Sequence, residues 1–374
     1  MKLLKNFGAI AVTDTTSGVI SSIFWLFIAS LLTVSNYGEI QFLISIASFA
    51  VGIAMLANSS TVIVYEVKKR GIRDALFLLT ILFGSIVSIF LFIFYSRFDL
   101  IFITFGLIFG EMVVGYFIGN KLFIKYGIFL ISQKVLMVGL AIGLYFVFGL
   151  EGIIYGIAIS YIPIAIVVIN SFKGASIKFS LLKDNLGFII NNYGVRLIAL
   201  SRRNLDKIII MPILGFEVLG EYALALQIYF AMILFTTISS KFLLYNDASG
   251  RNLKKFRIII IGISIIISIL GITLGPKIIP SLFPQFTNSI EILPIMSLAV
   301  IPNAIIVIFS SKFLGDEKSR YVLAGSILYA VIYLVLVTIL GSTYGLLGLS
   351  ISFLISTIIN ACYLGTMYKI KKKV

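Results

Sequence analysis

Long apolar stretches separated by short polar connections follow one another along the whole chain. Twelve of these stretches are 17 to 26 residues long. An α-helix rises about 1.5 Å per residue, so roughly 20 apolar residues are needed to cross the ~30 Å hydrocarbon core of a bilayer. The pattern predicts an all-α membrane protein with about 12 transmembrane helices, at residues 10–32, 40–65, 75–95, 100–119, 128–148, 153–169, 188–211, 220–240, 258–279, 292–311, 322–340 and 345–367.

The lysines and arginines fall on one side of this predicted arrangement. Of the 30 basic residues, 23 lie at the two ends of the chain and in every second connection, whereas only two lie on the opposite side, Arg97 in a connection and Lys277 at the end of a span. Basic residues in short loops favour the cytoplasmic side of a membrane. We therefore expect a multi-pass protein with both termini in the cytoplasm.

Composition narrows the function classes. The chain is 60% hydrophobic and 12% charged, which leaves no room for a sizeable aqueous domain. A formal net charge of +15 would suggest nucleic acid as the partner of a soluble protein. Here membrane orientation and attraction to anionic membrane lipids explain the charge, and we expect no nucleic-acid partner.

The chain offers little for catalysis or metal binding. It has no histidine and a single cysteine, Cys362, so an intrachain disulfide and a cysteine-based metal cluster are excluded. It also lacks the Gly-x-x-x-x-Gly-Lys-Ser/Thr loop that cradles nucleotide phosphates. We expect no enzyme activity, no catalytic residue, no metal and no cofactor.

Short patterns recur between the two halves of the chain. They stand 182 or 196 residues apart at equivalent places between spans, and the glycines that mark them are Gly38 with Gly220, Gly119 with Gly315, and Gly149 with Gly345. Six predicted helices separate equivalent points, so both halves enter the membrane from the same side, as in parallel repeats. The sequence predicts two six-helix lobes related by internal duplication, 1–180 and 181–374.

Pairs of glycines four residues apart predict close helix packing. Small residues at this spacing share one helix face and allow two backbones to approach. The pairs are Gly106/Gly110, Gly115/Gly119, Gly139/Gly143, Gly152/Gly156, Gly271/Gly275 and Gly341/Gly345.

Polar residues crowd the seventh predicted span. On a helix, four of them lie within about 80° of one another and form a stripe: Asn192, Arg196, Arg203 and Lys207. Asp206 lies at the edge of this stripe, and Arg202 flanks it. Cations in a bilayer need partners or water. One interpretation is that the cations form ion pairs between helices. The other, which we favour, is that they line a water-filled cavity that binds phosphate or carboxylate, because a guanidinium group can bind two oxygens of such a group at once.

Two further charged sites lie in predicted spans. Asp14 shares a helix face with Ser17 and could be a proton or Na⁺ coupling site or the counter-charge of an arginine. Glu111 and Lys134 lie at matching depths on either side of a short turn, and we expect them to form a buried pair that holds two helices in register.

Several motifs together resemble one family. The run from Arg202 through Asp206 to Ile210 is followed by Leu214-Gly215 and by Gly220-Glu221-Tyr222-Ala223-Leu224, and Tyr37-Gly38, Pro294-Ile295 and Gly315-Asp316-Glu317-Lys318 support the match. These segments are similar to those of Wzx-like polysaccharide-unit flippases of the multidrug/oligosaccharidyl-lipid/polysaccharide (MOP) exporter superfamily. The resemblance implies a MATE-like, V-shaped bundle of two lobes and a lipid-diphosphate-linked oligosaccharide as cargo.

The function we predict is movement of undecaprenyl-diphosphate-linked sugar units across the bacterial plasma membrane, for O-antigen or other surface polysaccharide. The predicted substrate-binding residues are Asn192, Arg196, Arg202, Arg203 and Lys207, and those for coupling or charge pairing are Asp14, Glu111, Lys134 and Asp206. A polysaccharide polymerase and a chain-length regulator are the expected protein partners. Two alternatives stay open: a MATE-type multidrug or cation antiporter, and an integral-membrane polysaccharide polymerase or glycosyltransferase.

Overall fold

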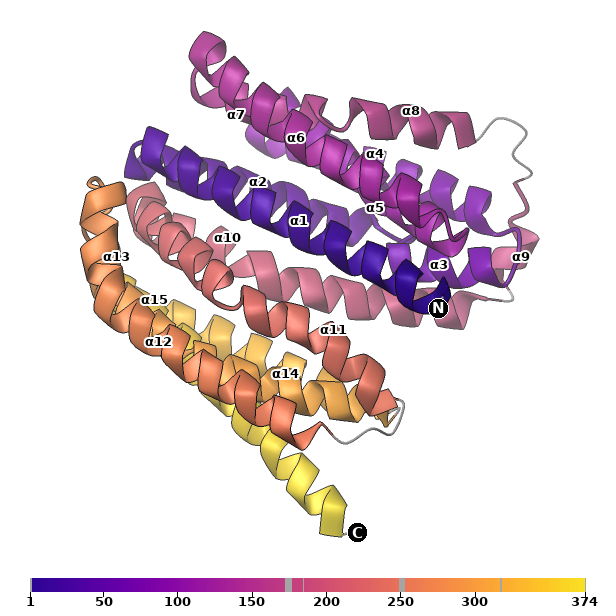
Figure 1. Ribbon diagram of the computed structural model, residues 1–374. Coiled ribbons are helices and arrows are strands. Elements are labelled where there is room, and N and C mark those ends of the chain that lie inside the picture. The colour runs from indigo at the N-terminus through magenta and orange to yellow at the C-terminus, as the bar shows by residue number, and fades with distance from the viewer. Residues whose placement is uncertain (1, 172–176, 184, 249–252, 317, 374) are drawn as a thin grey trace. The chain divides into compact units, whose positions relative to one another are not determined.

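The computed structural model describes residues 2–171, 177–183, 185–248, 253–316 and 318–373, and these residues form helices and no strands (Figure 1). Ten of the described helical stretches are long and apolar enough to cross a membrane. This confirms the predicted all-helical membrane fold. In chain order the helices are α1 (Lys2–Leu31), α2 (Val34–Ala54), α3 (Ser59–Val67), α4 (Arg73–Tyr95), α5 (Phe98–Gly119), α6 (Phe123–Phe148), α7 (Leu150–Ile159), α8 (Ile162–Ser171), α9 (Ser180–Lys183), α10 (Leu186–Met232), α11 (Leu234–Ala248), α12 (Lys254–Leu282), α13 (Ser289–Leu298), α14 (Val300–Gly315) and α15 (Ser319–Lys373).

Some predicted spans consist of two helices, and some pairs of spans form one long helix. The second span is α2 followed by α3, and Asn58 begins α3 by accepting a hydrogen bond from the Thr61 backbone N–H at 3.0 Å. The seventh span and the first part of the eighth lie in α10, which bends at Gly215 (φ 81°, ψ 176°), and the eighth span continues into α11. The eleventh and twelfth both lie in α15, which bends at Gly345 (φ 56°, ψ −132°). Glycine suits these bends because a left-handed φ strains residues with a side chain.

Two compact units divide the described chain. The first contains residues 1–24 and 43–204, and the second contains 25–42 and 205–374, so the division falls inside α1, α2 and α10. The lobe boundary near residue 180 stays a prediction.

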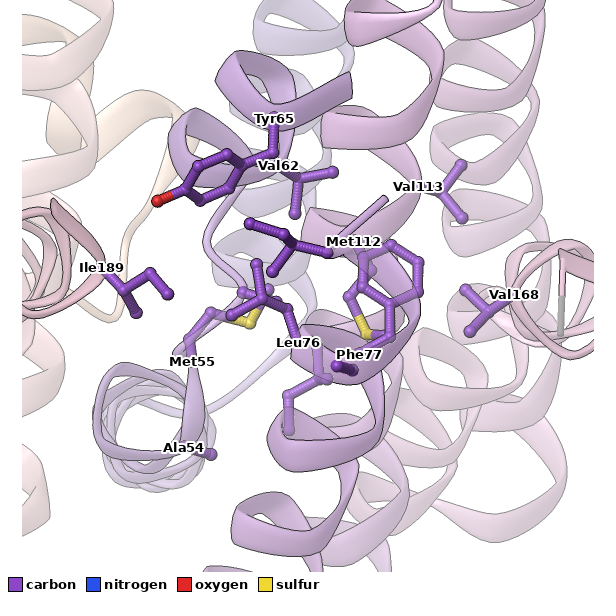
Figure 2. Close-up of a cluster of buried hydrophobic side chains, with 14 of the residues drawn as sticks. Ala54, Met55, Val62, Tyr65, Leu76, Phe77, Met112, Val113, Val168 and Ile189 are labelled. Atoms are coloured by element: carbon purple, nitrogen blue, oxygen red, sulfur yellow. The ribbon is translucent and has the colours of Figure 1, made fainter. Parts of the chain in front are cut away.

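The first unit has a buried apolar core. Figure 2 shows part of it, where side chains from α2, the turn after it, α3, α4, α5, α8 and α10 meet: Ala54, Met55, Val62, Tyr65, Leu76, Phe77, Met112, Val113, Val168 and Ile189. Lipid is as apolar as these side chains, so in a bilayer the core stabilises the unit through close packing more than through removal from water.

Large apolar side chains also cover the outside of the helices. Phe94 and Ile124 are each 77% exposed, and Phe146 is 75% exposed. Exposed apolar surface of this kind is unfavourable in water but fits a hydrocarbon surrounding. These faces are where we expect lipid to lie.

The glycines of one repeated pattern pack against each other in the second unit. A Cβ added at Gly38 would lie 2.9 Å from the carbonyl carbon of Phe216, and one added at Gly220 would lie 2.9 Å from the carbonyl carbon of Val34, with the carbonyl oxygens closer still. The two contacts are reciprocal, because Val34 and Phe216 are separated by the same 182 residues as the two glycines. The start of α2 and the region after Gly215 thus cross at a local two-fold arrangement.

A second repeated pattern gives the same backbone in each half. Gly149 has φ 64° and ψ −141°, close to the values at Gly345. Three residues after each of these glycines, a second glycine makes a close contact. A Cβ at Gly152 would lie 2.9 Å from the backbone nitrogen of Tyr145, and a Cβ at Gly348 would lie 3.0 Å from that of Gly341. Tyr145 and Gly341 are themselves 196 residues apart. Both helical hairpins close in the same way.

The third repeated pattern is a turn that ends α5 and α14. The turns share two backbone hydrogen bonds at equivalent positions: Asn120 N–H to Tyr116 O at 3.1 Å and Leu122 N–H to Phe117 O at 2.8 Å in the first, and Asp316 N–H to Lys312 O at 2.9 Å and Lys318 N–H to Phe313 O at 2.7 Å in the second. The three patterns therefore reflect repeated structure, as internal duplication predicts.

Most of the small-residue pairs pack as predicted, with one correction. A Cβ at Gly115 would meet Val62 at 2.7 Å, and one at Gly275 would meet Leu293 at 2.6 Å. At Gly139 and Gly143, however, a Cβ would meet nothing within 4 Å, so the prediction of close packing there is wrong. The spacing places both glycines on one face of α6, and at these two positions no described residue is in contact with that face.

Candidate functional site

The polar stripe of the seventh span lies on the first part of α10. The amide of Asn192 donates a hydrogen bond to the Phe188 carbonyl at 3.0 Å, within its own helix. The side chains of Arg202 and Arg203 lie outside the described part of the structure. Arg196 and Lys207 are therefore the two cations of the stripe whose side chains the structure describes.

Arg196 forms an ion pair with Glu111 of α5, through its Nη2 and the carboxylate Oε1. The Arg196 side chain is 35% exposed and that of Glu111 is 27% exposed. The pair is single-pronged: among the described residues, the buried Nε of Arg196 and the buried Oε2 of Glu111 have no hydrogen-bond partner. A guanidinium and a carboxylate can form two parallel hydrogen bonds, and this pair uses one.

A cavity of about 160 Å³, lined mostly by apolar side chains with a few polar ones among them, opens beside Glu111 in the first unit. Its polar lining comes from Glu111, Tyr126, Gln133, Lys134 and Tyr161, and apolar side chains complete the wall. The Gln133 amide donates to the hydroxyl of Ser160 at 2.9 Å, which fixes one side of the cavity. The predicted partners Glu111 and Lys134 thus share one cavity.

Asp14 is connected to the same cavity. The hydroxyl of Tyr126 on α6 donates a hydrogen bond to Asp14 Oδ1 on α1. The neighbouring Thr13 and Ser17 side chains are buried, and Thr13 lies where a Cβ at Gly127 would be 2.8 Å from its hydroxyl. The glycine lets α1 and α6 approach closely enough for the Asp14–Tyr126 bond to form.

The second unit holds the other predicted charged residues in a buried network. Asp206 is 5% exposed and Lys207 is 8% exposed. The Asp206 carboxylate accepts hydrogen bonds from the Lys207 backbone N–H at 2.8 Å and from the Tyr333 hydroxyl at 3.2 Å, and the hydroxyls of Tyr333 and Tyr222 are bonded to each other. Burial and these partners place Asp206 in a fixed position between α10 and α15.

The structure therefore gathers the predicted residues into two groups. Glu111 and Lys134 line the cavity of the first unit, and Arg196 and Asp14 bond two of its lining residues, Glu111 and Tyr126. Asp206 and Lys207 lie in the buried network of the second unit. In the described part of the chain, no group of three or more His, Cys, Asp or Glu side chains is placed to hold a metal ion.

Sequence reasoning missed the tyrosines of both groups. Tyr126, Tyr161, Tyr222 and Tyr333 supply hydroxyls or cavity walls. Tyrosine is tolerated in apolar spans, so its presence alone carries no signal. For Tyr222 a signal did exist, because it follows the paired Gly220-Glu221.

The fold is that of a known group of helical membrane transporters. A multidrug resistance MATE family transporter of the MOP superfamily, in an inward-facing conformation, superposes with a TM-score of 0.73 over 96% of this chain and 95% of its own. The lipid II flippase MurJ, in an inward closed conformation, gives 0.76 over 96% and 87%, and a MATE transporter of Vibrio cholerae gives 0.61 over 98% and 94%. Sequence identity is 14%, 14% and 16%.

No protein-family model and no curated protein sequence matches the chain. At these identities the solved structures establish the fold, which both drug transporters and a lipid flippase adopt. Cargo has to be argued from the residues of the site.

Proposed function

We propose that this protein is a flippase that moves prenyl-diphosphate-linked oligosaccharide units across the plasma membrane. Arg196 carries the proposal. It is a partly exposed guanidinium within a predicted span, and one of its buried donors has no partner among the described residues. A cation placed at membrane depth suits an anionic cargo whose lipid tail stays in the bilayer.

The remaining charges support this cargo through their sign. Four cations, Arg196, Arg202, Arg203 and Lys207, lie within 12 residues of α10, with Asp206 as the one acidic residue among them. A cavity for cationic drugs would favour the opposite sign. In the proposal Arg196, Arg202 and Arg203 contact the diphosphate or acidic sugars, Asn192 shares their helix stripe, and Lys277 and Asn288 face the outside.

A MATE-type cation antiporter is the second candidate, and one observation favours it. Asp14 is a carboxylate in the first span, bonded to Tyr126 beside the cavity, which is the kind of site that a proton or Na⁺ could occupy. In our proposal Asp14 couples the flippase to such an ion. A drug antiporter would instead extrude cationic dyes from cells, and Asp14→Asn would abolish that extrusion.

The test of the flippase is surface polysaccharide, measured by immunoblot and normalised to membrane-inserted protein, in a strain that lacks the native gene. Arg196→Gln should abolish surface polysaccharide at near-normal abundance, and Arg196→Lys should be partly tolerated because lysine keeps the charge without the two-pronged geometry. Lys277→Gln is the matched control, because it removes an exposed cation elsewhere in the chain. Normal polysaccharide from the Arg196→Gln variant would overturn the proposal.

A further inference from the structure

The ion pair between Glu111 and Arg196 is only half formed. One hydrogen bond joins the two groups, while a buried donor of the arginine and a buried acceptor of the glutamate are left without partners among the described residues. Buried charged groups are costly when unsatisfied. The pair therefore holds both side chains in place without satisfying either of them.

Arg196 and Glu111 each have access to other binding partners. The Arg196 side chain is 35% exposed, so part of the guanidinium is accessible to a ligand. Glu111 lines the same cavity as Lys134, which is carried by α6, the helix that follows α5. The cavity has room for several water molecules, and its other polar walls can bond them.

We propose that Glu111 is an exchangeable counter-charge for Arg196. This inference rests on the proposed function. Without cargo, Glu111 holds Arg196; when a diphosphate arrives, its oxygens replace the carboxylate at the guanidinium, and Glu111 turns into the cavity toward Lys134 and water. The exchange keeps Arg196 paired at every stage, because Glu111 holds it before the diphosphate arrives and the diphosphate holds it afterwards.

The exchange also gives selectivity. A diphosphate carries more negative charge than one carboxylate and offers several oxygens in a geometry that a guanidinium can bind twice, so it competes with Glu111. A neutral or cationic lipid cannot displace Glu111 from Arg196, so the ion pair stays intact and the guanidinium does not bind that lipid. Glu111 thereby acts as a positioning and selectivity residue that never needs to touch the cargo.

Binding of farnesyl diphosphate, a short prenyl diphosphate, to the purified full-length protein in lipid nanodiscs tests the exchange. Removing the competitor should tighten binding, so Glu111→Gln should lower the Kd about tenfold, within the usual range of coupling between sites. Glu111→Asp, which keeps the carboxylate but shortens its reach to Arg196, should also tighten binding. Lys134→Gln should weaken binding, because Glu111 then loses the group that receives it.

Glu151→Gln is the matched control, because it removes a carboxylate that is 66% exposed in the same unit and should leave the Kd unchanged. If the wild-type protein does not bind farnesyl diphosphate, or Arg196→Gln does not weaken binding, the proposed function fails. If those two results hold but Glu111→Asp and Glu111→Gln bind no more tightly than wild type, the exchange is overturned and the flippase stands. Should Glu111→Gln not fold, the Glu111→Asp and Lys134→Gln variants decide.

Discussion

The crossing of Gly38 and Gly220 gives a stability prediction with a magnitude. In Gly220→Ala, the new Cβ would lie 2.9 Å from the Val34 carbonyl carbon. Carbon atoms pack best at about 3.5–4.0 Å, so the two backbones must separate by roughly 1 Å. Overpacking of a close contact costs about 1–3 kcal/mol. We expect a loss of about 2 kcal/mol in the free energy of unfolding, or roughly 2–3 °C in Tm for a chain of 374 residues.

The assay is thermal unfolding of the purified protein in detergent, followed by intrinsic fluorescence. Gly139→Ala is the control: its Cβ would meet nothing within 4 Å, and alanine favours a helix interior over glycine by about 1 kcal/mol, so Tm should hold or rise. The double variant Gly38→Ala/Gly220→Ala should lose less than the sum of the single losses, since one separation relieves both contacts. Equal Tm values for Gly220→Ala and Gly139→Ala would refute the reasoning.

Two more predictions address orientation and the buried network. A cysteine placed at Asn288 should react with a membrane-impermeant maleimide in intact cells while one at Ser176 should not, because the basic connections are expected inside; labelling of the Ser176 cysteine would overturn the twelve-span arrangement. Tyr333→Phe removes a hydroxyl that bonds Asp206 and should lower the free energy of unfolding by about 1–3 kcal/mol. Tyr344→Phe is the control, because this tyrosine is 67% exposed and the change should leave the free energy of unfolding unchanged. Equal losses for the two variants would show that the network contributes nothing to stability.

Much of the fold follows from the sequence because the bilayer restricts it. An apolar run of about 20 residues has to be a helix or part of a barrel, so the spans are readable from hydropathy alone. Breaks inside spans are not readable in this way. The turn at 55–58 between α2 and α3 lies in an apolar run that one continuous helix would fit equally well.

Glycine patterns predict contacts where two backbones approach so closely that a Cβ would not fit between them. Gly38 and Gly220 were informative for this reason, because each meets a carbonyl of the other segment. Spacing on one helix says which residues share a face but not what the face meets. Gly139 and Gly143 show the consequence, since they share a face but a Cβ at either would meet no described atom within 4 Å.

The charged residues of the site were predictable one by one, but their arrangement was not. Arg196 and Glu111 are conspicuous as charges within apolar spans. Depth matching paired Glu111 with Lys134, whereas the structure adds Arg196, 85 residues away along the chain, as its ion-pair partner. Depth restricts position along the membrane normal alone, and it carries no information on which helices are neighbours.

The most direct measurement of the central claim is lipid flipping by the purified protein. Proteoliposomes would contain a fluorescent prenyl-diphosphate-linked oligosaccharide, and quenching of the outer leaflet would report the rate at which the lipid changes leaflets. We predict that wild-type protein accelerates this exchange over protein-free liposomes, that Arg196→Gln returns it near the protein-free rate, and that Lys277→Gln behaves as wild type. Exchange no faster than in protein-free liposomes, or equal rates for wild type and Arg196→Gln, would contradict the account.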